Sequence, residues 1–159
     1  MKTETIEKIL NFLKEKEGKK IPERWNIVEK FENHPDDIQY KYEGDLNINN
    51  KNITKLPNDL YVDGMLDLDG CEQLTKLPDK LYVGKTLSIM KTNIEELPDN
   101  LYVGGNLFLM EVSIEEIPNN LYVGWNLFIQ DTPLAKKYTD EEIYKIVAST
   151  GGEIVGNIF

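Results

Sequence analysis

A repeat with a period of about 20 residues dominates the sequence between residues 42 and 134. Four segments share the pattern aliphatic-Pro-x-x-Leu-Tyr-Val, and their prolines lie 21, 20 and 20 residues apart. These segments begin at Leu56, Leu77, Leu97 and Ile117. Because a unit of this length cannot bury its own apolar face, neighbouring units must stack to form a core. The repeat therefore predicts a solenoid in which each unit forms one coil.

A second motif, Leu-x-Leu or Leu-x-Ile, recurs between these segments. It begins at Leu46, Leu66, Leu87, Leu107 and Leu127, which predicts five coils. Alternating aliphatic residues favour a short strand whose middle residue faces outward, and equivalent strands of successive coils would form a parallel sheet. The opposite, Leu-Tyr-Val side of each coil is predicted to be strand or 3-10 helix.

Six positions of each coil form the predicted core, because they are aliphatic in all four coils that contain them. In the fourth coil they are Leu107, Leu109, Ile114, Ile117, Leu121 and Val123. A fully buried aliphatic side chain contributes about 1.5–3 kcal/mol, so these columns supply several tens of kcal/mol before the entropy of ordering is subtracted.

Residues 42–134 resemble the short bacterial and phage form of the leucine-rich repeat, whose units place an aliphatic residue between Leu-x-Leu and Leu-Pro. The stretch from Leu66 to Leu74 has one extra residue and Cys71, as in the longer variant of that family. The resemblance implies a parallel sheet on one face, whose concave surface holds a partner, and it implies no reaction. Thr92 and Val112 depart from the family pattern. A β-helix-like solenoid is the alternative architecture.

Both ends of the chain are expected to cap the solenoid. Residues 1–41 form a predicted helical N-terminal cap, and residues 135–159 form a predicted C-terminal cap of a helix and a short strand. Thr139 and Glu142 have the spacing of a capping box, and Gly151 follows the helix as its stop signal.

Composition excludes several classes of protein. Residues 45–134 hold six lysines and fourteen acidic residues, so the coils would repel phosphate backbones and we expect no nucleic-acid partner on this acidic repeat face. No apolar stretch is long enough to span a membrane, and no secretory signal is recognisable. A single cysteine, Cys71, allows no internal disulfide. We expect a cytoplasmic protein, in the host cytoplasm if a phage encodes it.

No catalytic motif or metal-ligand spacing occurs in the sequence. The run from Asp67 to Gly70 lacks the later carboxylates of a calcium loop, and Cys71 is interpreted as a buried structural residue. We therefore expect a protein that is not an enzyme and needs no cofactor.

The outward positions supply the candidate binding residues. The late coils gather large apolar side chains, which are typical of interfaces, and the early coils place acidic residues on the same sheet. The predicted partner-binding residues are Met90, Phe108, Met110, Trp125, Phe128, Asp67 and Asp69. The alternative is that the C-terminal cap covers the apolar patch.

A column of outward tyrosines is the secondary candidate surface, and it consists of Tyr61, Tyr82, Tyr102 and Tyr122. Such rings would stack at the strand separation of about 4.8 Å and stiffen the return side.

Three functions follow from these surfaces. The first is a protein-interaction module, a bacterial or phage-encoded modulator of a host protein. The alternatives are a self-associating structural component, and carbohydrate or peptide binding along the tyrosine column.

Overall fold

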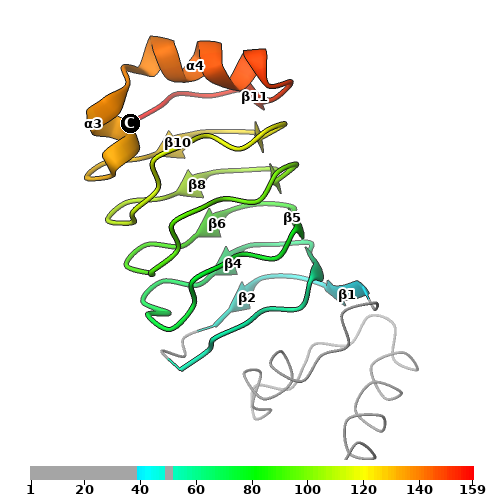
Figure 1. The fold of residues 1–159 in the computed structure, drawn as a ribbon. Helices are drawn as coiled ribbons and strands as arrows, with labels where there is room; N and C mark the ends of the chain where they lie inside the picture. The colour runs from blue at the N-terminus through cyan, green and yellow to red at the C-terminus, as the bar shows by residue number, and fades with distance from the viewer. Residues whose placement is uncertain (1–38, 49–51) are drawn as a thin grey trace, which may run out of the picture.

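The computed structural model describes residues 39–48 and 52–159, which fold into a solenoid with two parallel sheets (Figure 1). The Leu-x-Leu sheet contains β2 (Leu46–Asn47), β4 (Leu66–Asp67), β6 (Leu87–Ser88), β8 (Leu107–Phe108) and β10 (Leu127–Phe128). The tyrosine sheet contains β1 (Gln39–Tyr42), β3 (Asp59–Val62), β5 (Lys80–Val83), β7 (Tyr102–Val103), β9 (Tyr122–Val123) and β11 (Glu153–Ile154). The predicted repeat solenoid is confirmed. Its return side is strand, which makes it a β-solenoid. The expected N-terminal helix lies outside the described residues.

Equivalent residues of successive coils pair with each other in both sheets. Leu127 is in register with Leu107, and Tyr122 with Tyr102. The pairing continues around the corner between the sheets, where the Gly104 N–H donates to the Val83 carbonyl (2.9 Å). Each coil is therefore hydrogen-bonded to the next along both sheets and along the corner that joins them.

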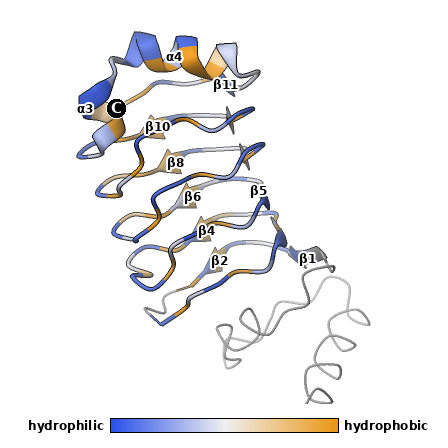
Figure 2. Cartoon of the chain, viewed as in Figure 1, coloured by the Kyte–Doolittle hydropathy of each residue, from blue (hydrophilic) through white to orange (hydrophobic). Residues whose placement is uncertain are grey.

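The core lies between the two sheets and follows the aliphatic columns (Figure 2). In the fourth coil Leu107, Leu109, Ile114, Leu121 and Val123 are buried as expected. Ile117 is the exception, because it is only half-buried and packs against the edge of the core. The inward pattern read from the sequence thus describes the core of every described coil closely.

From β4 onward, the turn after the Leu-x-Leu strand has a left-handed residue at the same position of each coil. Gly70, Lys91, Glu111 and Asp131 have φ values of 70°, 57°, 61° and 62°. This conformation is unfavourable for residues with a Cβ atom. Its recurrence shows that the solenoid imposes the turn on whichever residue occupies the position.

The residue directly after this left-handed residue is buried, and in three of these four coils it donates to a backbone carbonyl. In the longer coil the Cys71 thiol donates to the Ile48 carbonyl (3.1 Å). In two later coils the Thr92 and Thr132 hydroxyls donate to the Ile89 and Ile129 carbonyls at 2.8 and 2.7 Å. Cysteine and threonine therefore act here as buried donors, which agrees with a structural role for Cys71.

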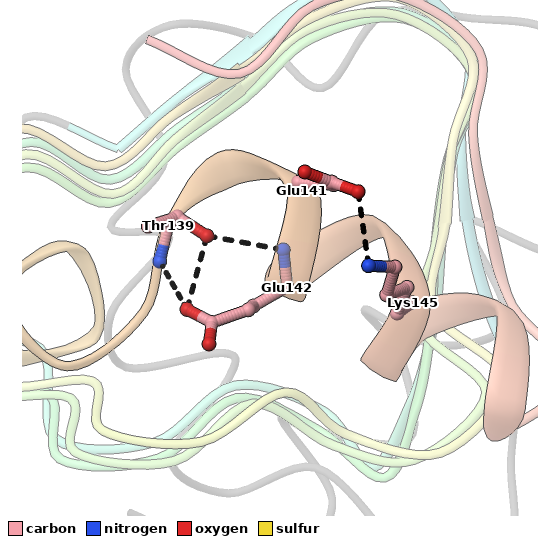
Figure 3. Close-up of polar contacts among 4 residues, drawn as sticks. All are labelled: Thr139, Glu141, Glu142 and Lys145. Carbon is pink, nitrogen blue, oxygen red and sulfur yellow. Dashed lines mark hydrogen bonds and ion pairs between the residues drawn. The ribbon is translucent and has the colours of Figure 1, made fainter.

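The C-terminal end carries α3 (Pro133–Lys137) and α4 (Asp140–Ser149), and α4 lies across the end of the solenoid (Figure 1). The capping box is confirmed. Thr139 Oγ1 accepts a bond from the Glu142 N–H (3.3 Å), and the Glu142 carboxylate accepts one from the Thr139 N–H (2.8 Å; Figure 3). Ile143 and Val147 of α4 are buried against the last coil. The sequence did not predict the short helix α3.

The last seven residues add a further layer to both sheets. Strand β11 pairs with β9 in the tyrosine sheet, and Ile158 then pairs with Leu127 of the Leu-x-Leu sheet. The Tyr144 hydroxyl of α4 donates to the Gly156 carbonyl (2.6 Å), which fixes the helix to this layer. The C-terminal segment is therefore a partial coil with α4 packed over it.

Candidate interaction surface

Phe108 and Phe128 lie on the outward face of the Leu-x-Leu sheet, in adjacent coils. Their rings stack with centroids 4.4 Å apart and planes 9° apart, and both side chains are half-buried. Stacking hides the inner ring faces, so the pair presents ring edges and its outermost faces. The structure thus brings together two of the residues that the sequence predicted for binding.

A third phenyl ring, which the sequence analysis missed, extends this column. Phe159 stacks on Phe128 at 5.0 Å, and half of its surface remains exposed (50%). The C-terminal segment therefore lengthens the apolar column instead of burying it. The signal was present in the sequence, because Ile158-Phe159 repeats Leu127-Phe128, but the insertion of two helices breaks the 20-residue spacing.

Met90 and Met110 occupy the next outward position of their coils, and both are half-buried. They lie two residues after the ends of the strands β6 and β8 and directly precede the left-handed residues Lys91 and Glu111. Lys91 and Glu111 form an exposed ion pair (3.6 Å). The methionines therefore lie between the phenyl column and a charged rim.

Trp125 lies at the corner between the two sheets and is strongly exposed (63%). Its backbone N–H donates to the Gly105 carbonyl (3.0 Å), and its carbonyl accepts from the Gly156 N–H (2.8 Å). Glycines thus occupy the same position in the coils on either side. The indole has no large side chain above or below it in this column.

Asp67 and Asp69 lie on the early half of the Leu-x-Leu sheet and take part in its hydrogen bonding. Asp67 accepts bonds from the Asn47 amide (2.8 Å) and from the Asp69 N–H (3.0 Å). Asp69 accepts bonds from the Ser88 hydroxyl (2.5 Å) and the Met90 N–H (2.9 Å). These carboxylates connect neighbouring coils, so they have a structural role in addition to any contact with a partner.

The tyrosine column forms on the opposite sheet. Successive ring centroids are 4.3, 4.6 and 4.7 Å apart, and the planes are within 6° of each other. The Lys41 ammonium lies 5.5 Å from the centroid of Tyr61 and closes one end. Glu153 is in register with Tyr122 at the other end. Because the rings cover each other's faces, the column exposes mainly ring edges and hydroxyl groups.

Desolvation raises the pKa of the Tyr82 and Tyr102 hydroxyls above the ordinary value for tyrosine. The hydroxyl of the adjacent tyrosine raises it further. The Tyr61 hydroxyl raises the pKa of Tyr82, and the Tyr82 hydroxyl raises that of Tyr102. Burial raises the pKa of Tyr40, in β1, to about 12. Tyr82 and Tyr102 are therefore expected to stay uncharged under ordinary conditions.

Charged residues are absent from a large part of the late coils. Residues 100–110, 119–130 and 154–159 contain no Asp, Glu, Lys or Arg, although such residues make up 29% of the chain. We name these residues the uncharged band. It contains Phe108, Phe128 and Phe159 on one sheet and Trp125 at the corner. Interface cores have this composition, with few charges and many aromatic side chains.

Within residues 39–48 and 52–159, no three His, Cys, Asp or Glu side chains are grouped closely enough to hold a metal ion. In the same residues no helix has the length and apolar character needed to cross a membrane. No family model, no curated protein and no solved structure matches the chain. The membership of the leucine-rich repeat family therefore stays a prediction.

Proposed function

We propose that this protein is an interaction module that binds another protein through the late coils of its Leu-x-Leu sheet. The observation that carries the proposal is the stacked column of Phe108, Phe128 and Phe159 on an outward, charge-free part of the solenoid. Aromatic side chains contribute most of the binding free energy in many interfaces. A rigid sheet also presents them without a large cost in conformational entropy.

The rest of the chain supports a binding role by its architecture. Each coil uses its inward residues for the core and leaves its outward residues free to vary, so adjacent coils can carry different surfaces. Here the early coils carry the hydrogen-bonded Asp67 and Asp69, whereas the late coils carry apolar rings. We extend the proposal to a cytoplasmic, bacterial or phage-encoded modulator of a host protein, supported by the sequence resemblance.

Site-specific photo-cross-linking tests the proposal. A photoreactive phenylalanine analogue replaces Met110, beside the phenyl column, and the matched control places it at Lys145 on the solvent face of α4. In lysate of the cells that produce the protein, the Met110 probe should give a discrete cross-linked partner that excess wild-type protein competes away. Equal labelling from the two positions would contradict the proposal.

Self-association is the second candidate, because the exposed ring of Phe159 ends the phenyl column and could contact another copy. Sedimentation of the purified protein distinguishes the two. A monomer at micromolar concentration supports a foreign partner, whereas a stable dimer that dissociates on replacing Phe159 with Thr supports self-association.

The tyrosine column is the third candidate. Its mutual ring stacking favours a stiffening role over carbohydrate or peptide binding.

A further inference from the structure

A row of asparagines in the uncharged band has its side-chain oxygens already in use. Asn106 Oδ1 accepts a bond from the Asn126 backbone N–H (3.1 Å), and Asn126 Oδ1 accepts one from the Asn157 N–H (2.9 Å). Among the described residues, the Nδ2 groups of Asn106, Asn126 and Asn157 have no acceptor. Each Nδ2 carries two N–H groups, so the row offers mainly donors to a ligand.

Aromatic residues precede and follow this row along the chain. Trp125 precedes Asn126 directly, whereas Phe108 and Phe128 lie two residues after Asn106 and Asn126. Two residues of a strand span about 7 Å, so the amide row and the phenyl column run parallel at that separation. The Trp125 indole adds another donor, because its Nε1 donates and never accepts. The surface therefore combines donors, aromatic rings and no charge.

These properties fit a proline-rich segment in the polyproline II conformation. Proline has no backbone N–H, so such a segment offers carbonyl acceptors only, and its backbone carbonyls have no internal partners. Its rings are apolar and pack against aromatic side chains. An uncharged segment also needs no charged residues opposite it.

The spacing along a polyproline II helix also matches the spacing between the coils of the solenoid. A polyproline II helix rises about 3.1 Å per residue, so carbonyls three residues apart lie about 9.3 Å apart on the same face. Two coil spacings of the solenoid amount to about 9.6 Å. Carbonyls at positions i and i+3 of the ligand would therefore reach the amides of Asn106 and Asn157, which are two coils apart.

We propose that the uncharged band binds a proline-rich polyproline II segment along the solenoid axis, over the amide row and between Trp125 and the phenyl column. This inference rests on the proposed function and names the chemistry of the partner. Trp125 is the central aromatic contact, and the Nδ2 groups of Asn106 and Asn157 donate to carbonyls three residues apart in the ligand.

Calorimetric titration of the full chain with a decaproline peptide tests the inference, with a glycine-serine peptide of equal length as the control ligand. Decaproline should bind saturably, and its affinity should change little between about 50 and 500 mM salt, because no charges contribute. Replacing Trp125 with Ala should weaken binding at least about tenfold. This side chain is exposed, so the fold should be unaffected.

The substitution Asn106→Asp isolates the donor. A carboxylate keeps the acceptor for the Asn126 N–H, as Asp45 does for the Met65 N–H (2.8 Å), but it removes both N–H groups of Nδ2. Binding of decaproline should fall about tenfold. Ser113→Asp, which adds the same charge at an exposed position outside the band, should bind like the wild type.

Three results would overturn the inference. They are equal affinity for the glycine-serine peptide, wild-type affinity in Asn106→Asp, and binding of a neutral glucose oligosaccharide in place of decaproline. A Met110 probe that cross-links a partner while decaproline fails to bind would reject this ligand and leave the proposed function standing. Failure of both experiments would reject the two together.

Discussion

A single inward leucine of this solenoid contacts the coil below and the coil above, because equivalent residues are paired in register. Leu107 is fully buried and is in register with Leu87 on one side and Leu127 on the other. This position could be assigned from the sequence alone, since periodic aliphatic residues report burial directly. The buried thiol of Cys71 could be inferred in the same way. Its bond to the Ile48 carbonyl could not, because that bond depends on the geometry of the preceding coil.

Replacing Leu107 with Ala should lower the free energy of unfolding by about 2–5 kcal/mol, because the cavity lies in the middle of the stack and cannot collapse easily. Urea denaturation followed by circular dichroism measures the change. Ser113→Ala, at an exposed position of the same coil, serves as the control and should alter stability by less than about 0.5 kcal/mol. An unchanged midpoint for Leu107→Ala would be incompatible with stacked coils.

The capping box of α4 should shift the titration of Glu142. Bonds from the Thr139 backbone N–H, and then from its hydroxyl, lower the pKa of the Glu142 carboxyl. Since the folded pKa lies below the unfolded value, the stabilisation is present above about pH 4.3 and is lost as the pH falls through the folded pKa. Carbon-detected NMR should show a depressed midpoint that moves upward in Thr139→Ala. An ordinary midpoint in the wild type would speak against the capping box.

At the scale of elements, short strands of two to four residues are held in place by their neighbours rather than by their own length. The Leu-x-Leu strands and the helix α4 were predictable, because alternation and a capping box are local signals. The choice between strand and 3-10 helix on the return side was not, since it depends on pairing between coils. Gly104 illustrates this dependence. A Cβ atom on it would lie 2.2 Å from the Gly84 carbonyl oxygen of the preceding coil.

Gly104→Ala should therefore destabilise the protein, because the added methyl group collides with backbone that cannot move without breaking the ladder between coils. We expect a loss of about 1–3 kcal/mol, as for other overpacked sites. Thermal unfolding measures it, with Ser113→Ala again as the control. A melting temperature equal to that of the wild type would show that the corner between the sheets is looser than described.

The tyrosine column predicts a loss of stability in alkali. The pKa of Tyr82 and of Tyr102 is raised in the folded protein, so their contribution is complete below about pH 10 and disappears as the pH rises through the folded pKa. Tyrosinate absorbance should show these late titrations. Tyr82→Phe keeps the ring stack but removes one hydroxyl, and it should lower the pKa of Tyr102. A Tyr102 titration unaffected by this change would contradict the coupling.

At the scale of the whole molecule, the outward face of the Leu-x-Leu sheet is acidic and hydrogen-bonded in the early coils and uncharged and aromatic in the late coils. The residues of the phenyl column could be chosen from the sequence, because outward positions of a repeat can be counted. The contribution of Phe159 could not, since two helices interrupt the period before it. The donor row of Asn106 and Asn126 also needed the structure, because only the bonds between coils show which amide atoms are free.

The double variant Phe108→Thr, Phe128→Thr tests the central claim most directly, with melting temperature and partner capture measured on the same preparation. Threonine favours strands, and both rings lie outside the core, so the protein should stay folded with a melting temperature only several degrees lower. Capture of the partner that the Met110 probe identifies should be lost. A folded double variant that still captures this partner as the wild type does would contradict the account, and so would a variant that fails to fold.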